Sequence, residues 1–162
     1  MTKFELTAET ITFFGKTLFR IKALISFGNV KAGELGGYVE KEENLDHGGN
    51  AWVYGDAWVY GNARVYGDAR VYGNARVCGD AWVCVDADYA TAKGFGSVFR
   101  TTTFYRTKEN QIGVRCGCFS GTLEQFREKV ISTYPDDKKG KEYLMLADLM
   151  EYHFKGRIEE EK

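Results

Sequence analysis

The most regular pattern of apolar and polar positions lies in residues 50–87, which read NAWVYG DAWVYG NARVYG DARVYG NARVCG DAWVCV DA. Each six-residue unit has an alanine and a valine two positions apart, with a tryptophan or an arginine between them. Because side chains alternate across a strand, the alanine and valine share one face and the intervening residue takes the other. The constant apolar face predicts the inside, with Val65 and Val71 buried, and the variable face predicts the outside.

Each unit closes on a glycine followed by Asn or Asp, except the last. Glycine, Asn and Asp tolerate left-handed backbone conformations, so this step predicts a corner. A fixed short period is the signature of a solenoid, and a hexapeptide period is typical of a parallel β-helix. The repeat therefore predicts the architecture of the middle of the chain.

The repeat resembles the left-handed β-helix of the hexapeptide-repeat family, in which three hexapeptides form one triangular coil. This resemblance implies that residues 18 apart lie above one another. Three outer stacks suited to cation–π contact follow: Trp52 on Arg70, Trp58 on Arg76, and Arg64 on Trp82. The same spacing gives three further stacks: Tyr54 on Tyr72, Tyr60 on Cys78, and Tyr66 on Cys84. Cys78 and Cys84 are then on different faces, which argues against a disulfide between them.

The first 43 residues contain short apolar runs typical of strands. Residues 3–6, 11–14 and 17–27 are the expected strands, and Gly15–Lys16 is typical of a tight hairpin turn. The glycines of residues 33–37 favour turns and close backbone approach that lead into the first coil. A phosphate-binding loop is disfavoured there, because neither a strand-then-helix context nor a P-loop lysine accompanies the glycines.

Residues 44–49 fit the repeat imperfectly, with Leu45 at the alanine position and His47 at the valine position. Hexapeptide acyltransferases typically use a histidine as general base. The phase of the repeat, however, points His47 inward at the end of the β-helix. We therefore interpret it as a capping or structural histidine.

Residues 97–106 and 111–119 predict a β-hairpin, with its turn at residues 108–110. Ile112, Val114, Cys116 and Cys118 would share one face of the second strand, with Arg115 on the other. The two cysteines are interpreted as half-buried strand residues, since a metal would need two further ligands and no second Cys or His pair is near in sequence.

Residues 122–157 predict two helices. Thr122 and Gln125 have the spacing of a capping box. Apolar residues follow at helical spacing: Leu123, Phe126, Val130, Ile131 and Tyr134 in the first helix, and Tyr143, Leu146, Ala147, Met150 and Phe154 in the second, which starts near residue 141. The hairpin and helices form a unit that packs on itself or caps the last coil.

These elements predict a mainly β protein with a short left-handed parallel β-helix. The expected parts are an N-terminal β segment (1–43), the hexapeptide-repeat β-helix (44–90), and a C-terminal α+β domain of a hairpin and two helices (91–162).

Composition narrows the function classes. The chain has 162 residues and a net charge of −1, so there is no general electrostatic case for DNA or an anionic membrane. It contains no apolar run long enough to span a membrane and no signal-peptide core. Four cysteines without such a signal suit a reducing cytosol, so we expect a cytoplasmic protein. No cofactor or metal is expected.

The flanks resemble a group of phage and prophage accessory proteins. The matching stretches are a KFEL strand, an AG-x-LGG-[YFW]-[VI]-E segment, the repeats, and a CGCF-x-GTL strand and helix: residues 3–6, 32–40, 50–83 and 115–123. The resemblance implies a mobile-element origin and supplies no catalytic residues. Small phage accessory proteins often blunt host defence, which is an association at the level of the class.

We therefore expect a non-catalytic accessory protein, a host-defence inhibitor that either occludes a host protein or sequesters a small nucleotide-like ligand. The alternatives are a hexapeptide acyltransferase and a purely structural phage protein. Against the acyltransferase, the repeat has no loop insertion for coenzyme A, no outward histidine and only about two and a third coils.

The outer aromatic residues predict an interface and a homotrimer, because three flat faces suit three-fold packing. Outward arginines beside flat rings suit an anionic ligand with a planar group, or a protein partner. In a competing interpretation, each arginine only stabilises the solenoid by stacking. The candidate binding residues are Arg64, Arg70, Arg76, Trp52, Trp58, Trp82, Tyr60 and Tyr66 in the repeat, and Arg106 and Arg115 in the C-terminal unit.

Overall fold

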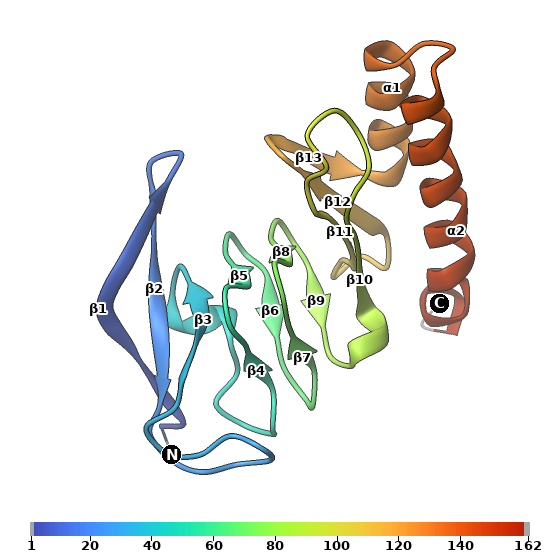
Figure 1. Cartoon of the computed structure of the whole chain (residues 1–162). Coiled ribbons are helices and arrows are strands. Elements are labelled where there is room, and N and C mark those ends of the chain that lie inside the picture. Colours follow the sequence, from blue (N-terminus) through green and yellow to red (C-terminus); the bar gives the residue numbers. More distant parts are fainter. Residues whose placement is uncertain (1, 161–162) are drawn as a thin grey trace.

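The computed structural model describes residues 2–160, with side chains as far as residue 156. Three parts follow one another along the chain: a long N-terminal β-hairpin, a stack of short strands, and a C-terminal sheet with two helices (Figure 1). The stack lies between the other two parts (Figure 1). The protein is thus mainly β, with its helices confined to the C-terminal end.

The repeat forms six two-residue strands: β4 (Trp52–Val53), β5 (Trp58–Val59), β6 (Arg64–Val65), β7 (Arg70–Val71), β8 (Arg76–Val77) and β9 (Trp82–Val83). Strands three units apart pair in parallel, with Trp52 beside Arg70 and Val53 beside Val71. The pairs β5–β8 and β6–β9 keep the same 18-residue spacing. The predicted spacing of 18 residues between stacked strands is confirmed.

The inside of the solenoid is built from the alanines and valines of the six complete units, all of which are buried. Val65 and Val71 are among them, as predicted. Gly61 and Gly67 turn the chain at corners with φ of 66° and 64°, a conformation that glycine adopts at little cost. Alanine and valine at constant phase thus fix the solenoid's inner face.

The N-terminal hairpin consists of β1 (Phe4–Phe13) and β2 (Lys16–Ala23), which pair antiparallel. The predicted hairpin is confirmed, but its turn lies at Phe14 and Gly15, with φ of 46° and 78°, one residue before the predicted Gly15–Lys16. The prediction of two separate strands before the turn is wrong. A single strand runs through, and an irregular register between Leu6 and Thr10 accommodates the polar residues there.

The glycine-rich segment forms β3 (Leu35–Val39), which joins the hairpin to the solenoid. It pairs antiparallel with β2 and parallel with β5, giving the sheet order β1-β2-β3-β5-β8. The predicted turn is confirmed at Gly33, which has φ of 92°, but it is wrong for residues 35–39, which form a strand. The predicted close approach is correct. A Cβ on Gly36 would lie 2.6 Å from the Val53 carbonyl oxygen, and one on Gly37 would lie 2.5 Å from that of Ala57.

The start of the repeat has a different phase from the one predicted. Leu45 pairs with Val65, 20 residues later, so it takes the valine position instead of the alanine position. The short 3-10 helix η1 (Glu42–Asn44) precedes it, and residues 46–49 form the loop that absorbs the difference. His47 is consequently part of this loop and half-buried, and it does not point into the solenoid.

The C-terminal sheet is antiparallel in the order β10-β11-β12-β13 and is covered by two helices. Its elements are β10 (Tyr89–Ala92), β11 (Thr102–Arg106), β12 (Ile112–Cys116), β13 (Phe119–Thr122), α1 (Leu123–Thr133) and α2 (Lys138–Glu160). The predicted cap is confirmed, since the Thr122 hydroxyl accepts a hydrogen bond from the backbone of Gln125 at 3.1 Å. Ile131 was expected in the apolar stripe but is 58% exposed.

The boundaries of the C-terminal strands differ from the predicted ones. The strand expected over residues 97–106 begins only at Thr102, and residues 89–92 form an extra strand. The return strand ends at Cys116, since Gly117 turns the chain with φ of 60°. Cys118 is therefore exposed and does not share the strand face of Cys116.

The C-terminal unit caps the last coil of the solenoid. The Thr103 hydroxyl accepts a hydrogen bond from the backbone N–H of Arg76 at 2.9 Å, and Asp86 accepts one from that of Arg70 at 2.8 Å. Tyr89 accepts one from the N–H of Tyr72 at 3.1 Å. These side chains replace the carbonyl groups of an absent next coil, so the open edge is satisfied.

Two hydrophobic cores result. The first runs without a break from the hairpin through the solenoid and includes Tyr105 of β11. The second lies between the C-terminal sheet and the helices, around Phe104, Phe126 and Phe154. The hairpin and solenoid therefore share one core, and the C-terminal unit has its own.

Candidate functional site

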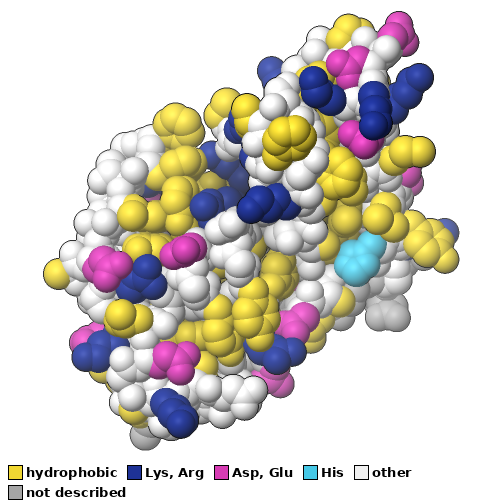
Figure 2. Space-filling view, in the orientation of Figure 1, with side chains coloured by type: hydrophobic (Ala, Val, Ile, Leu, Met, Phe, Trp, Pro, Cys, Tyr) yellow, Lys and Arg dark blue, Asp and Glu magenta, His cyan; other side chains and the backbone are white. Residues whose placement is uncertain are grey.

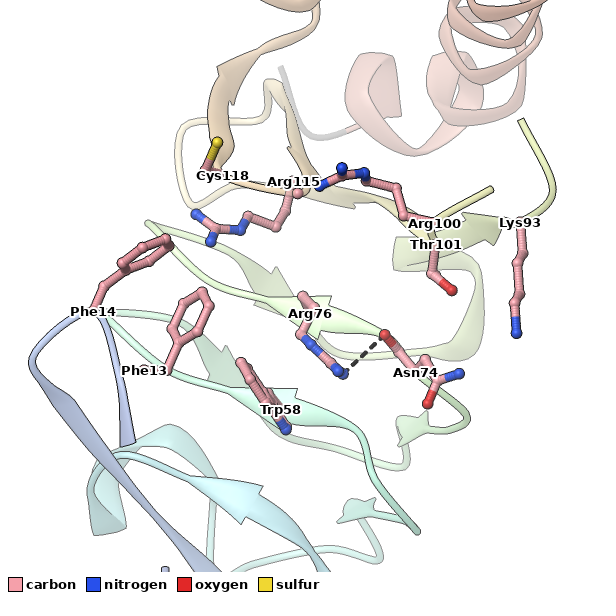
Figure 3. A pocket seen from close by; sticks show the side chains of 11 residues that line it. Phe13, Phe14, Trp58, Asn74, Arg76, Lys93, Arg100, Thr101, Arg115 and Cys118 are labelled. Atoms are coloured by element: carbon pink, nitrogen blue, oxygen red, sulfur yellow. Dashed lines mark hydrogen bonds between the residues drawn. The ribbon is translucent and has the colours of Figure 1, made fainter. Parts of the chain in front are cut away.

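A cleft of about 650 Å³ opens where the three parts of the chain meet. Its walls are the hairpin turn, the solenoid face of β5 and β8, and residues of the C-terminal unit (Figure 3). Four cationic and three aromatic side chains line it: Arg76, Lys93, Arg100 and Arg115, and Phe13, Phe14 and Trp58. None of the described residues that line it carries a carboxylate, and we call it the basic cleft.

The solenoid wall carries a stacked pair. The Arg76 guanidinium lies over the Trp58 ring, 3.9 Å from its centroid, because the 18-residue register places these residues side by side. Nη1 of Arg76 donates to backbone carbonyl groups, including that of Asn74 at 2.9 Å (Figure 3). Burial lowers the pKa of Arg76, and the neighbouring Arg115 lowers it further, whereas Tyr60 and Asp56 oppose the shift.

Arg115 extends into the basic cleft from β12 and is only 9% exposed. Its guanidinium lies 5.1 Å from the Phe13 ring centroid and 6.0 Å from that of Tyr60. Among the described residues, nothing accepts a hydrogen bond from its buried Nη2 atom. A buried donor without a partner costs roughly 1–3 kcal/mol, so an anion at this atom would be strongly favoured.

The hairpin turn supplies the aromatic side of the cleft. The Phe13 ring packs against Trp58 with a centroid distance of 4.8 Å, and it packs against Phe14 at 4.6 Å. Phe14 is 75% exposed at the turn. Flat apolar surface thus borders the cleft beside Arg76 and Arg115 (Figure 3).

Lys93 and Arg100 lie at the exposed rim of the cleft. Arg100 lies against Gly117 and occupies the space that a side chain there would need. Figure 2 shows basic side chains beside hydrophobic ones in the hollow between the hairpin and the C-terminal unit. Because the whole chain carries a net charge of −1, this positive charge is a local feature.

The three predicted Trp–Arg pairs of the repeat differ in their contacts. Of the predicted Trp–Arg stacks, a cation–π contact forms between Arg76 and Trp58. The guanidinium of Arg70 lies over Tyr72 instead, and it pairs with Asp86 at 2.8 Å.

On the third face, the guanidinium of Arg64 lies over Tyr66, 5.5 Å from the ring centroid. Trp82, 36% exposed, meets Tyr66 edge-on with a centroid distance of 6.3 Å. Arg64, Tyr66 and Trp82 are therefore outside the basic cleft. The stack predicted for Tyr54 and Tyr72 is confirmed, with centroids 4.5 Å apart.

Two residues predicted at the outer surface of the repeat are buried. Trp52 is fully buried, since Phe4 and Phe27 of the N-terminal part pack on its ring at 6.4 and 5.3 Å. Tyr60 is buried by Phe13 and the C-terminal unit. The expectation of an open surface at these positions is wrong, because segments outside the repeat cover them.

Arg106 and Arg115 have different surroundings although both are buried. Nε of Arg106 lies 3.2 Å from Oδ1 of Asp88, in a fully buried ion pair beneath the last coil. Oδ2 of Asp88 also accepts a hydrogen bond from the backbone of Cys84 at 2.9 Å. Arg106 therefore holds the cap in place, whereas Arg115 faces the basic cleft.

The sequence prediction missed Phe13, Phe14, Lys93 and Arg100. Two consecutive phenylalanines at a predicted hairpin turn could have indicated the site. A turn is exposed, so large apolar side chains there are not explained by packing in the core. Lys93 and Arg100 lie in a segment with no repeat or motif, and nothing in the local sequence marks them.

His47 has a structural role, as predicted. Its Nδ1 accepts a hydrogen bond from the backbone N–H of Lys3 at 3.0 Å, and its Nε2 lies 2.9 Å from a Glu42 carboxylate oxygen. The ring stacks on Phe4 with a centroid distance of 4.4 Å. Both ring nitrogens are thus engaged in joining the N-terminus to the start of the solenoid.

The cysteines and acidic residues add no further site. All four cysteines are free, with Cys78 buried and Cys118 exposed at the rim of the cleft. Among the described residues, no three His, Cys, Asp or Glu side chains gather as metal ligands would. No helix in the described part of the chain is long and apolar enough to cross a membrane.

Fold and site together define a β-solenoid repeat protein with a basic, aromatic cleft at the junction of its flanks. A family model described as the YdcK beta solenoid repeat matches residues 57–71 and 69–84. These residues span β5 to β9, so the match supports a repeat β-solenoid in that stretch. The comparison with curated proteins gives no match.

Proposed function

We propose that this chain is a non-catalytic binding protein whose basic cleft holds a small anion with a planar group, such as a nucleotide. The observation that carries this proposal is Arg115, a buried guanidinium with an unpartnered Nη2 atom in a cleft whose lining has no carboxylate. The volume of about 650 Å³ is within the range of small-molecule sites, about 300–1,000 Å³.

The division of chemistry inside the cleft favours this ligand class. Guanidinium groups bind phosphate through paired N–H donors, and Arg115 has one such donor free. Phe13 and Trp58 present rings on which a planar group can stack. An anion alone would leave the rings unused, and an uncharged aromatic compound would leave the guanidinium unpaired.

The test is isothermal titration calorimetry with three probes. Adenosine 5′-monophosphate combines charge and plane, adenosine keeps only the plane, and inorganic pyrophosphate keeps only the charge. We expect the nucleotide to bind at least about tenfold more tightly than either partial probe. A tenfold difference in Kd corresponds to about 1.4 kcal/mol of binding free energy. Equal or undetectable binding of all three would refute the proposal.

The repeat offers matched control variants, because Arg64, Arg70 and Arg76 occupy the same position in successive units. Only Arg76 lines the basic cleft. Arg76→Ala should weaken nucleotide binding, and Arg64→Ala and Arg70→Ala should leave it unchanged. Equal effects of all three substitutions on binding would place the site elsewhere on the repeat.

The biological setting is proposed from the resemblance of the flanks alone. If the chain is a phage accessory protein, sequestering such a ligand would withhold it from a host defence. Occlusion of a host protein is the alternative, and co-purification from host cells with parallel small-molecule analysis would distinguish the two. Left-handed winding of the solenoid is likewise proposed from the resemblance.

Assembly as a homotrimer stays a prediction. The surface on which it rests is smaller than expected, because Trp52 and Tyr60 are buried within the chain. Tyr72 and Trp82 remain exposed, at 44% and 36%. Light scattering at micromolar concentration tests it, and a stable monomer would exclude the trimer.

A further inference from the structure

A second cavity, of about 250 Å³, adjoins the basic cleft. Arg100 and Cys118 line both spaces, so the two cavities meet at these side chains. Its remaining walls come from residues 97–98, the end of β12, β13 and the helices. They are largely apolar or aromatic, with Val98, Phe119, Phe126, Val130, Tyr134 and Tyr143. We call it the apolar chamber.

The two tyrosine hydroxyls of the chamber wall already have partners within the chain, and the other polar side chains of the helices that line it, Lys129 and Thr133, are exposed. The Tyr134 hydroxyl bonds the Ser97 hydroxyl at 3.0 Å, and the Tyr143 hydroxyl donates to the Phe95 carbonyl oxygen at 3.1 Å. What the chamber offers a ligand is therefore apolar surface. In the basic cleft, by contrast, Nη2 of Arg115 lacks a partner among the described residues.

Arg100 stands at the junction between these two environments. It reaches this position because Gly117 has no side chain to occupy the same space. Its charge lies beside the basic cleft, where Arg115 and Arg76 also point (Figure 3). A phosphate held near Arg100 would therefore have charged groups on one side and the apolar chamber on the other.

We infer that the ligand is a phosphate ester that carries an apolar substituent. Its phosphate binds between Arg115 and Arg100, its planar group lies against Phe13 and Trp58, and the substituent on the phosphate enters the apolar chamber. This inference rests on the proposed function and adds the second half of the ligand.

The experiment compares adenosine 5′-monophosphate with its phenyl phosphodiester by calorimetry on the full chain. Both probes carry the same planar group, and the ester adds one aromatic ring at the phosphate. We expect the ester to bind about tenfold or more tightly, because burying a ring removes apolar surface from water.

Thr133 is exposed on α1 and lines the chamber, so Thr133→Trp should fill it without disturbing the core. We expect this variant to lose the preference for the ester while keeping its affinity for the nucleotide. The matched Thr133→Ala substitution should keep the preference. If the tryptophan variant does not fold, Val98→Ser, at a residue 61% exposed, should reduce the preference.

The outcomes separate the two proposals. If the nucleotide binds but the ester binds no more tightly, the chamber is not a ligand site and the proposed function stands. The inference is also overturned if the tryptophan variant keeps the full preference for the ester. If neither probe binds the wild-type chain, both proposals are refuted.

Discussion

Replacing Arg115 by methionine should make the free protein more stable and unable to bind the nucleotide. The substitution removes a buried donor without a partner, which costs roughly 1–3 kcal/mol, and keeps an apolar side chain of similar length. It also removes the contacts of the guanidinium with the rings of Phe13 and Tyr60, which are worth about 0.5–2 kcal/mol. The balance is a gain of about 1 kcal/mol in the free energy of unfolding.

For a chain of this length, a gain of that size raises Tm by about 2–4 °C in calorimetry. With the nucleotide present, the wild type should be more stable than the Arg115→Met variant. A nucleotide at 100 times its Kd adds about 2.7 kcal/mol to the free energy of unfolding of the wild type only. A fall in the Tm of the free Arg115→Met variant would show that the guanidinium is a structural group and refute the reasoning.

Arg106 on the neighbouring strand β11 provides the control. It is more deeply buried than Arg115, but Asp88 pairs with it, and Arg106→Met would leave that carboxylate buried without its cation. Breaking a buried pair from one side costs about 3–5 kcal/mol. We therefore expect opposite shifts in Tm from the same substitution in two buried arginines.

Three further predictions concern stability. Val65→Asp places a charge in the solenoid interior and should cost several kcal/mol, so an unchanged Tm would mean that the inner and outer faces are reversed. Gly37→Ala should lower stability by about 1–3 kcal/mol in urea unfolding, because its Cβ would meet the Ala57 carbonyl; unchanged stability would contradict this close approach. Burial lowers the pKa of Lys3 to about 8, partly offset by Asp46. Since the unfolded lysine keeps its proton up to its ordinary pKa of 10.5, wild-type stability should rise from pH 8 toward pH 10 by up to about 3 kcal/mol. Lys3→Met should flatten this rise. An equal rise in the variant would contradict the assignment to Lys3.

The rise predicted for Lys3 has an upper limit in pH. Burial raises the pKa values of Tyr60, Tyr105 and Tyr143 above their ordinary value of 10.0. These phenols keep their protons in the folded chain when the unfolded chain has lost them, so their contribution to stability falls above pH 10. The window for measuring Lys3 is therefore about pH 8 to 10.

The repeat could be predicted because its information is local and redundant. Val, Ala and Gly each keep one phase along the repeat, so the inner face, the corners and, with the family resemblance, the 18-residue register follow from the sequence. The segment at residues 35–39 escaped prediction because its glycines resemble a turn. They form a strand only because the solenoid backbone approaches too closely for side chains.

The basic cleft could not be predicted as a unit, since its residues come from three distant segments. Arg76 and Arg115 were among the candidates, yet nothing in the sequence indicated that they share a cleft with Phe13. Trp52 shows the opposite case. Its position in the repeat is outward, but contacts with Phe4 and Phe27 bury it.

The arginine position of the repeat thus has a different environment on each of the three faces. On one face, Arg70 is neutralised by Asp86 at the end of the repeat. On the second face, Arg64 lies over Tyr66 beside the partly exposed Trp82. On the third, the hairpin turn and the C-terminal unit approach Arg76 from either side and leave the basic cleft between them (Figure 3). The repeat supplies a rigid surface with regularly spaced arginines, and the segments outside it determine where a ligand can bind. Related chains that keep the repeat but differ around Phe13 and Arg115 should therefore share the fold and differ in what they bind.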